Sequence, residues 1–301
     1  MLRSMYSGIA GMRGFQTQLD IVGNNIANVN TVGFKKGRVT FQDMMSQTVA
    51  GASAPTGIRG GVNAQQVGLG SQIGSIDNIH TQGNRQTTNR ALDLALEGDG
   101  MFVFATGIAL DANAVDIADV NLQYSRAGNL YLDDFGYIVN PNGQYLLGVN
   151  GLTAEVEGQE PDNITVGAEQ ATRIRIPESA SSFSIQGDGT VIYIDANNQT
   201  QEAGQIMLAN FSNPGGLEKV GSNMYRSSVN DGMVGTNGIP QLIAPETQGV
   251  AQIVSGALEM SNVDLAEEFT DMIVGQRGFQ ANTRIITTSD EILQELVNLK
   301  R

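Results

Sequence analysis

The sequence contains no cysteine, no tryptophan and a single histidine, His80, among its 301 residues. Without cysteine the chain cannot form disulfide bonds, thiolate nucleophiles or cysteine-ligated metal sites. One histidine cannot build a histidine-rich metal site. Charged residues make up only 16% of the chain, whereas glycine is abundant, with 37 residues. This composition favours a turn-rich β protein over a helical enzyme.

Long apolar runs and an excess of positive charge are also missing. No stretch of about 18 consecutive apolar residues is present, so we expect no membrane-spanning helix and no membrane insertion. Residues 1–14 are interrupted by glycine, serine and arginine. They therefore lack the continuous apolar core of a cleaved signal peptide. The formal net charge of −14 makes nucleic acid an unfavourable partner.

Apolar residues near the N-terminus follow the spacing of an amphipathic helix. Steps of three and four residues, followed by two seven-residue steps, place them on one narrow seam. The run Asn24–Asn28 is poor in helix-forming residues. The pattern therefore predicts a helix over residues 1–30, roughly 40 Å long at 1.5 Å per residue. The seam consists of Leu2, Met5, Ile9, Met12, Leu19 and Ile26.

The C-terminal region carries the most regular apolar pattern in the sequence. Six apolar residues repeat at seven-residue intervals over residues 258–301, which predicts a second long amphipathic helix. The segment Ser261–Asp264 resembles a capping box and sets the helix start near residue 262. The repeating residues are Leu258, Leu265, Met272, Phe279, Ile286 and Leu293.

The two terminal segments carry opposite charge. Residues 1–38 hold five basic residues and one acidic residue, a net of +4, whereas residues 259–301 hold four basic and eight acidic residues, a net of −4. Opposite charges favour pairing, and an isolated amphipathic helix is marginally stable in water. We therefore predict that the helices pair as a coiled coil, either within one chain or as the core of an assembly. The twelve seam and repeat residues are the candidate core.

The region between the helices is rich in glycine and in short alternating apolar runs. Asn142–Gly143 is a strong hairpin signal, because a type I′ turn needs positive φ at both central residues. We predict a β-rich domain over residues 81–150 and 178–257, an extended connector over 31–80, and a short outer insertion over 151–177. The expected fold class is α+β, a mainly β middle domain with two terminal helices.

No constellation of catalytic residues can be assembled. Ser-His-Asp catalysis would have to run through His80, whose neighbours are ordinary polar positions. The run Asp111–Asp116 hints at a calcium loop but lacks the glycine and glutamate of an EF-hand. Asp133 and Asp134 are adjacent, so on a strand they would point to opposite faces. The sequence predicts no enzyme activity, no cofactor and no metal.

Several segments, in order, resemble the signatures of the flagellar rod and hook axial protein family. The first is Asn24–Lys35. His80–Asn84 with Leu92–Phe102 resembles the family's entry into its β domain, Tyr124–Asn129 its next hairpin, and Ser261–Phe269 with Gln276–Asn282 its closing helix. The resemblance covers essentially the whole chain. The motif residues of the first segment are Asn24, Asn25, Asn28, Gly33 and Phe34.

The resemblance implies a structural subunit that polymerises into the flagellar hook, a hollow curved tube that transmits torque from rod to filament. It implies that the terminal helices line the tube core and order on assembly. The implied partners are further copies of the chain, neighbouring rod and hook–filament junction proteins, the hook cap and the flagellar type III export apparatus. The implied location is extracellular, in the flagellum, after export without a cleaved signal peptide.

Two other functions remain open from the sequence. A distal rod protein of the basal body is the first, because the region 151–177 is too short for the outer domain that hook subunits commonly carry. A secreted extracellular binding module built on the β domain is the second. That module would be a folded monomer with ordered ends, whereas an assembly subunit should lose polymerisation when both ends are trimmed.

Overall fold

The computed structural model describes residues 2–56, 59–106, 115–116, 121–149, 170–232, 235–236, 239–240, 242–247 and 249–299. The chain divides into two compact units. The first comprises residues 1–29, 36–79 and 263–301, and the second comprises residues 30–35 and 80–262. The expected α+β class is confirmed, because the described residues are mainly β with one helix near each terminus.

The first unit contains both predicted helices. Helix α1 spans Leu2–Ala27 and helix α2 spans Leu265–Leu299, so the expected ends near residues 30 and 262 are correct to within three residues. The Oδ1 atom of Asp264 accepts a hydrogen bond from the backbone N–H of Ala266 at 2.8 Å. This contact satisfies one of the free donors at the start of α2, as an N-cap does.

The prediction that Leu258 belongs to the C-terminal helix is wrong. Leu258 lies in strand β24 (Ala257–Glu259) and is paired with Gln86 of strand β5 (Arg85–Thr87). The seven-residue spacing continued by one step into a short strand that happens to place leucine at that position. The cap at Asp264 marks the true helix start.

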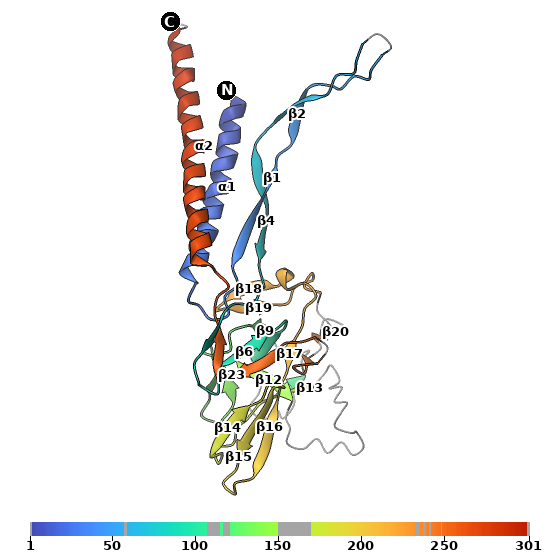
Figure 1. Ribbon diagram of the computed structural model, residues 1–301, viewed down its shortest axis with the longest axis vertical. Helices are drawn as coiled ribbons and strands as arrows, with labels where there is room; N and C mark the ends of the chain where they lie inside the picture. Colours follow the sequence, from blue (N-terminus) through green and yellow to red (C-terminus); the bar gives the residue numbers. More distant parts are fainter. Residues whose placement is uncertain are drawn as a thin grey trace. The chain divides into compact units, whose positions relative to one another are not determined.

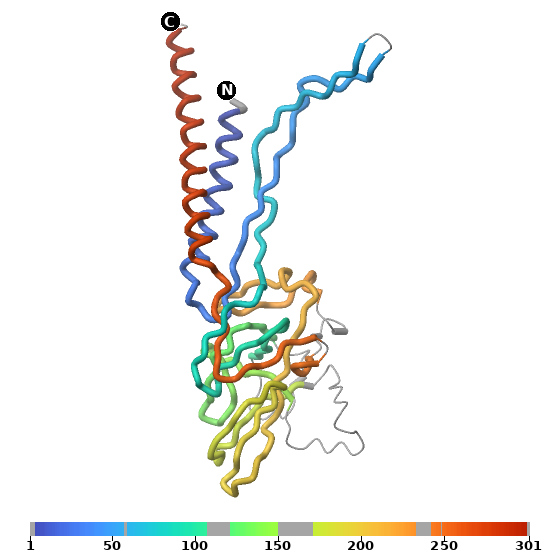
Figure 2. Tube along the Cα trace, in the orientation of Figure 1, coloured from blue at the N-terminus to red at the C-terminus, as the bar shows by residue number. Residues whose placement is uncertain are grey.

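The connector predicted over residues 31–80 contains a long two-stranded ribbon that the sequence patterns did not reveal. Strand β1 (Gly37–Asp43) pairs with β4 (Ser71–Asn78), and β2 (Ser46–Ala50) pairs with β3 (Gln65–Gly68), all antiparallel. Figure 2 shows the two chain segments running side by side. Every residue of β2 and β3 is exposed, so burial imposes no apolar alternation that could have signalled a strand.

The second unit is built on one large sheet. Fourteen of its described strands join this sheet, whose longest path runs β14-β15-β16-β12-β7-β9-β19-β18 (Figure 1). The remaining strand bounds are β6 (Leu94–Glu97), β7 (Met101–Thr106), β8 (Val115–Asp116), β9 (Asn121–Ser125), β10 (Tyr131–Leu132), β11 (Ile138–Val139), β12 (Tyr145–Val149), β13 (Gln170–Arg173), β14 (Ser182–Ile185), β15 (Thr190–Ile194), β16 (Thr200–Ile206), β17 (Leu208–Ala209), β18 (Glu218–Gly221), β19 (Met224–Arg226), β20 (Gly235–Thr236), β21 (Ile239–Pro240), β22 (Leu242–Ile243) and β23 (Gln252–Ser255).

Strand β7 lies in the middle of the sheet and is buried on both faces. Phe102 and Phe104 belong to one hydrophobic cluster, whereas Met101, Val103 and Ala105 belong to another. Because successive side chains of a strand point to opposite faces, the two clusters occupy the two sides of this strand. The second unit therefore has a core of its own.

The predicted hairpin at Asn142–Gly143 is present between β11 and β12, but its turn differs from the expected type. Gly143 has φ +76°, whereas Asn142 is not among the positive-φ residues. The side chain of Asn140 supplies the missing constraint. Its Oδ1 atom accepts hydrogen bonds from the backbone N–H groups of Asn142 at 3.0 Å and Gln144 at 2.9 Å.

The outer insertion predicted over residues 151–177 lies largely outside the described residues. Its final part is described, and it contributes to the sheet and the core. Strand β13 pairs with β12 and β8, and Ala171, Ile174 and Ile176 are buried. Residues 170–176 are thus part of the β core and differ from the expected surface segment.

We expect Gly128→Ala to lower the free energy of unfolding of the second unit by about 3 kcal/mol or more. A Cβ atom there would overlap the backbone oxygen of Leu94, so backbone would have to move. The matched control is Gly215→Ala, whose Cβ would meet its nearest atom at 3.6 Å. Urea unfolding followed by tyrosine fluorescence measures both variants, and equal stabilities would contradict the packing described.

Candidate functional site

Helices α1 and α2 lie side by side and antiparallel (Figure 1). Contacts run from Gly8, whose Cβ would meet Ile286 at 3.4 Å, to Asn25, which donates to Glu268. At Gly278 a Cβ would lie 2.6 Å from the Phe15 ring. Glycine at this position allows the aromatic ring to rest against the backbone of the facing helix.

The predicted core residues take partly buried positions on these helices. Leu265 is 40% exposed and lies at the start of α2. The side chain of Leu2 is outside the described set, and Leu258 is in β24. The intermediate exposure of the others shows that the contact between two helices covers this seam only in part. The partly buried residues are Met5, Ile9, Met12, Leu19, Ile26, Met272, Phe279, Ile286 and Leu293.

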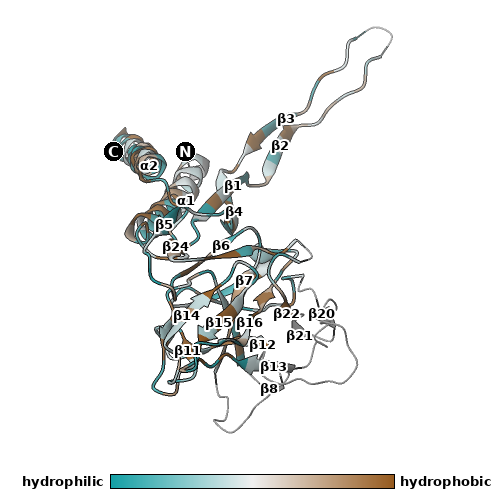
Figure 3. Cartoon of the chain, turned by 60° about the horizontal axis from the view of Figure 1, so that its bottom comes forward, coloured by the Kyte–Doolittle hydropathy of each residue, from teal (hydrophilic) through white to brown (hydrophobic). Residues whose placement is uncertain are grey.

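Helix α2 also exposes large apolar side chains that α1 does not cover. Phe269 is 49% exposed, Ile273 59% and Val297 66%. Figure 3 shows hydrophobic residues interspersed with hydrophilic ones along this helix. Because exposed apolar side chains mark interaction sites, the exposed apolar residues of α2 together form the candidate assembly surface. Its residues are Leu265, Phe269, Ile273, Val274, Ile285, Ile292, Leu296, Val297 and Leu299.

Asn25 of the first motif connects three elements of the first unit. Its side chain is buried and forms two hydrogen bonds with the backbone of Gly37, one to the carbonyl oxygen at 2.9 Å and one from the N–H at 3.0 Å. Its Nδ2 atom also donates to Oε2 of Glu268 at 3.1 Å. Burial raises the pKa of Glu268, and the hydrogen bond from Asn25 opposes that shift. This asparagine thus joins α1, α2 and the ribbon.

The other motif residues have local structural roles. The side chain of Asn28 donates to the backbone oxygen of Asn24 at 2.9 Å, which satisfies a carbonyl in the last turn of α1. Gly33 has φ +69°, and a Cβ there would lie 2.6 Å from the backbone nitrogen of Ala127. Phe34 is buried, with the ammonium group of Lys219 4.9 Å from its ring centroid.

The last residue of this segment, Lys35, takes part in a buried ion pair. The Nζ atom of Lys35 lies 2.6 Å from Oε1 of Glu259, and the side chains are 0% and 1% exposed. Lys35 also donates to the backbone oxygen of Thr81 at 2.8 Å, and the backbone N–H of Gly83 donates to Oε1 of Glu259 at 3.0 Å. Desolvation lowers the pKa of Lys35, and the Glu259 carboxylate opposes that shift.

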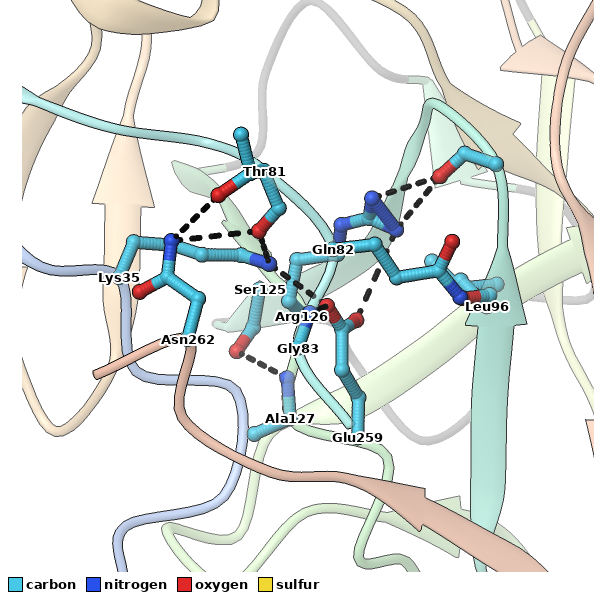
Figure 4. A network of polar contacts seen from close by, with 11 residues as sticks. Lys35, Thr81, Gln82, Gly83, Leu96, Ser125, Arg126, Ala127, Glu259 and Asn262 are labelled. Carbon is cyan, nitrogen blue, oxygen red and sulfur yellow. Dashed lines mark hydrogen bonds and ion pairs between the residues drawn. The ribbon is translucent and has the colours of Figure 1, made fainter. Parts of the chain in front are cut away.

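Arg126 is the second cation beside this carboxylate. Its Nη1 atom lies 3.7 Å from Oε2 of Glu259, and both terminal nitrogens donate to the backbone oxygen of Gly98, at 2.9 and 2.6 Å. Figure 4 shows these groups converging from separate chain segments. A buried charge without a partner is strongly destabilising, so Lys35 and Arg126 both depend on Glu259.

The network unites segments that the sequence analysis singled out one by one. Lys35 ends the first motif, Thr81 and Gly83 belong to the second, and Arg126 belongs to the third. Sequence reasoning named none of the charged members as site residues. The available signal was a single basic residue in the first and third motifs, Lys35 and Arg126, but their pairing with Glu259 depends on the fold.

His80 lies against this network. Its ring centroid is 5.4 Å from that of Tyr225, and neither ring nitrogen has a hydrogen-bond partner among the described residues. Burial, reinforced by the nearby positive charges of Lys35, Lys219 and Arg126, lowers the pKa of His80 to about 4. Burial also raises the pKa of the Tyr225 hydroxyl to about 12. These groups are therefore uncharged at neutral pH.

The other candidate chemical groups lie apart from this network. Asp133 and Asp134 sit in the exposed turn between β10 and β11. Residues 111–114 of the possible calcium loop are outside the described residues. Within the described ranges, no three His, Asp or Glu side chains are grouped to hold a metal ion. Neither of the described helices is long and apolar enough to cross a membrane.

Three protein-family models match the chain. The model described as "Flagella basal body rod protein" matches residues 5–35, which cover most of α1 and the first motif. The "Flagellar hook protein FlgE/F/G D1 domain" model matches residues 95–193 in the β unit. The "Flagellar basal body rod FlgEFG protein C-terminal" model matches residues 254–299, including α2.

Full-length relatives agree with these matches. Flagellar basal-body rod protein FlgG of Bacillus subtilis (strain 168) is 52% identical over 301 residues and covers all of both chains. Flagellar hook protein FlgE of Borreliella burgdorferi is 34% identical over 451 positions, again covering all of both chains. Flagellar basal-body rod protein FlgG of Caulobacter vibrioides is 32% identical and covers 99% of this chain and 100% of that protein.

We expect Gly278→Ala to weaken the pairing of α1 and α2, because the new methyl group would overlap the Phe15 ring. The matched control is Gly23→Ala in α1, whose Cβ would have no neighbour within 4 Å. That change should favour the helix by about 0.5–1 kcal/mol, since alanine has the higher helix propensity. Hydrogen exchange of the helix amides should therefore become faster in the first variant and slower in the second. The same direction of change in both variants would contradict the packing described here.

Acidification should destabilise the second unit through His80. Its folded-state pKa is about 4, below the ordinary value of 6.5, so the unfolded state takes up the proton first as pH falls. The stabilisation is complete above pH 6.5, and about 3 kcal/mol should be lost as the pH falls through 4.

The comparison is between the parent and His80→Gln, measured by urea unfolding from pH 7 to pH 4. The carboxylates titrate in both proteins, so the difference between the two curves isolates the histidine. Parallel curves would show that His80 is not buried in the way described.

Proposed function

Because this chain belongs to the flagellar rod and hook protein family, whose members are structural proteins and not enzymes, we propose that it is a subunit of the distal rod of the flagellar basal body. The observation that carries the proposal is the end-to-end match to a rod protein at 52% identity, with an alignment no longer than the chain itself. This match agrees with the sequence prediction of a non-enzymatic axial subunit.

The hook function predicted from the sequence has less support. The alignment with the Borreliella hook protein spans 451 positions, whereas this chain has 301 residues. The hook relative therefore has at least 150 aligned positions without a counterpart here. This number of extra positions is large enough for an outer domain in the hook relative. The hook stays the second candidate, because the same relative is 34% identical across the whole chain.

The structure of the first unit supports polymerisation with further copies of the chain. The assembly surface on α2 exposes large apolar side chains along the helix, and the ribbon exposes Phe41, Met45 and Val49. A two-stranded ribbon alone is marginally stable in water. Packing of both features against neighbouring copies would remove this apolar surface from solvent. In that assembly the helices would complete a coiled-coil core whose seam is half covered in one chain.

Electron microscopy of a deletion strain beside its complemented parent tests the assignment. Basal bodies that stop within the rod would support the distal rod. A complete rod without hook and filament would transfer the assignment to the hook. Normal flagella in the deletion strain would contradict both.

We expect Leu296→Asp to abolish assembly, because the charge would be placed on an apolar face that must be desolvated between copies. Leu296 is 48% exposed, so the change should leave the subunit itself folded. The matched control is Asn298→Asp, which introduces the same charge two residues further along α2. Pelleting of polymer from purified subunits, with circular dichroism of the unassembled protein, measures both. Normal polymerisation of the Leu296 variant would count against this surface.

A further inference from the structure

The chain crosses between the two units four times, and all four crossings adjoin three short segments of the second unit. The chain passes between the units at residues 29–30, 35–36, 79–80 and 262–263. The adjoining parts of the second unit are residues 30–35, 80–84 and 257–262. Although these segments are far apart in the sequence, they are bound to one another by short polar contacts.

Backbone groups form part of this connection. The N–H of Gly33 donates to the backbone oxygen of Glu259 at 2.8 Å, and the N–H of Met260 donates to that of Asn84 at 2.8 Å. Asn262 adds a side-chain hydrogen bond to Oγ1 of Thr81 at 2.9 Å. Each of the three segments is thus bonded to at least one of the others.

The carboxylate of Glu259 is the centre of the connection. It lies in the third segment and accepts one hydrogen bond from Lys35 of the first and one from Gly83 of the second, at 2.6 and 3.0 Å. Figure 4 shows both contacts reaching the same carboxylate. Removing this group would leave the three segments without their shared acceptor.

These contacts lie close in sequence to the ends of the two helices, so they affect how readily the helices pair. Helix α1 ends at Ala27 and α2 begins at Leu265, so the helices are separated by almost the whole second unit. Closing a chain loop costs free energy that rises with its length. The contacts between residues 33–35 and Glu259 close this loop a few residues from each helix.

We propose that Glu259 and Lys35 are positioning residues: they hold the attachment points of the two terminal helices side by side, so that α1 and α2 meet at high effective concentration within one free subunit. A purely stabilising ion pair would change the stability of the β unit alone. A positioning pair changes, in addition, how often the two helices meet while the β unit stays folded.

The absence of cysteine from the chain allows a direct measurement. A Cβ on Gly11 would lie 3.2 Å from Cγ of Asn282, the place that a cysteine sulfur would take. The double substitution Gly11→Cys and Asn282→Cys therefore creates a pair at disulfide distance across the helices. Equilibration of the dilute monomer with glutathione gives the effective concentration of the two thiols.

The measurement is repeated in this background with Lys35→Met, Glu259→Gln and the control Glu218→Gln. Glu218 forms an exposed ion pair with Arg226 in the same unit, so its change removes a carboxylate charge without touching the network. We expect the first two changes to lower the effective concentration of the thiols about fivefold or more, because the helix attachments become longer and looser. The control should match the parent.

Urea unfolding by tyrosine fluorescence establishes that the β unit is folded in each variant under the conditions of the thiol measurement. If Glu259→Gln fails to fold, Lys35→Met decides the question, since it leaves Glu259 with its contacts to Gly83 and Arg126. A folded Lys35→Met variant with the effective concentration of the parent would overturn the proposal. The measurement uses unassembled subunits, so a failure of the rod assignment would leave its result unaffected.

Discussion

The ion pair between Lys35 and Glu259 is the interaction on which the chain's organisation depends. A fully buried charge pair costs desolvation, and it is favourable only when further hydrogen bonds complete it. Here Thr81 and Gly83 supply those bonds, and Arg126 adds positive charge beside the carboxylate. The residues come from chain segments that adjoin the helices and the ribbon. Correct folding of the β unit is therefore coupled to the placement of the segments that lead to both terminal helices.

In the first unit, glycine and asparagine residues hold the helices and the ribbon in close contact. Glycines on both helices let side chains rest on the opposite backbone, as Phe15 does at Gly278. Asn25 fixes the ribbon beside the helices through paired hydrogen bonds with Gly37. The result is a well-defined helix pair in which α2 keeps large apolar side chains exposed. A subunit with these properties is suited to bury those side chains against further copies of itself.

Sequence reasoning predicted what depends on local pattern. Apolar steps of three and four residues predicted α1, the seven-residue repeat predicted α2, and the turn chemistry around Gly143 predicted the β11–β12 hairpin. The seven-residue repeat was wrongly extended to Leu258, because spacing alone does not distinguish a strand residue from a helical one. The exposed ribbon escaped detection since no burial pattern accompanies it. The contact between Lys35 and Glu259 could not be foreseen, because these residues are 224 positions apart in the sequence and meet only in the folded chain.

A double-mutant cycle on Lys35 and Glu259 tests the central claim most directly. The parent, Lys35→Met, Glu259→Gln and the double variant are unfolded in urea at neutral pH, and the free energies are combined into a coupling energy. We expect a coupling energy of about 2 kcal/mol or more. The double variant should therefore lose less stability than the sum of the losses of the two single variants. A coupling below about 0.5 kcal/mol would show that the pair does not organise the junction.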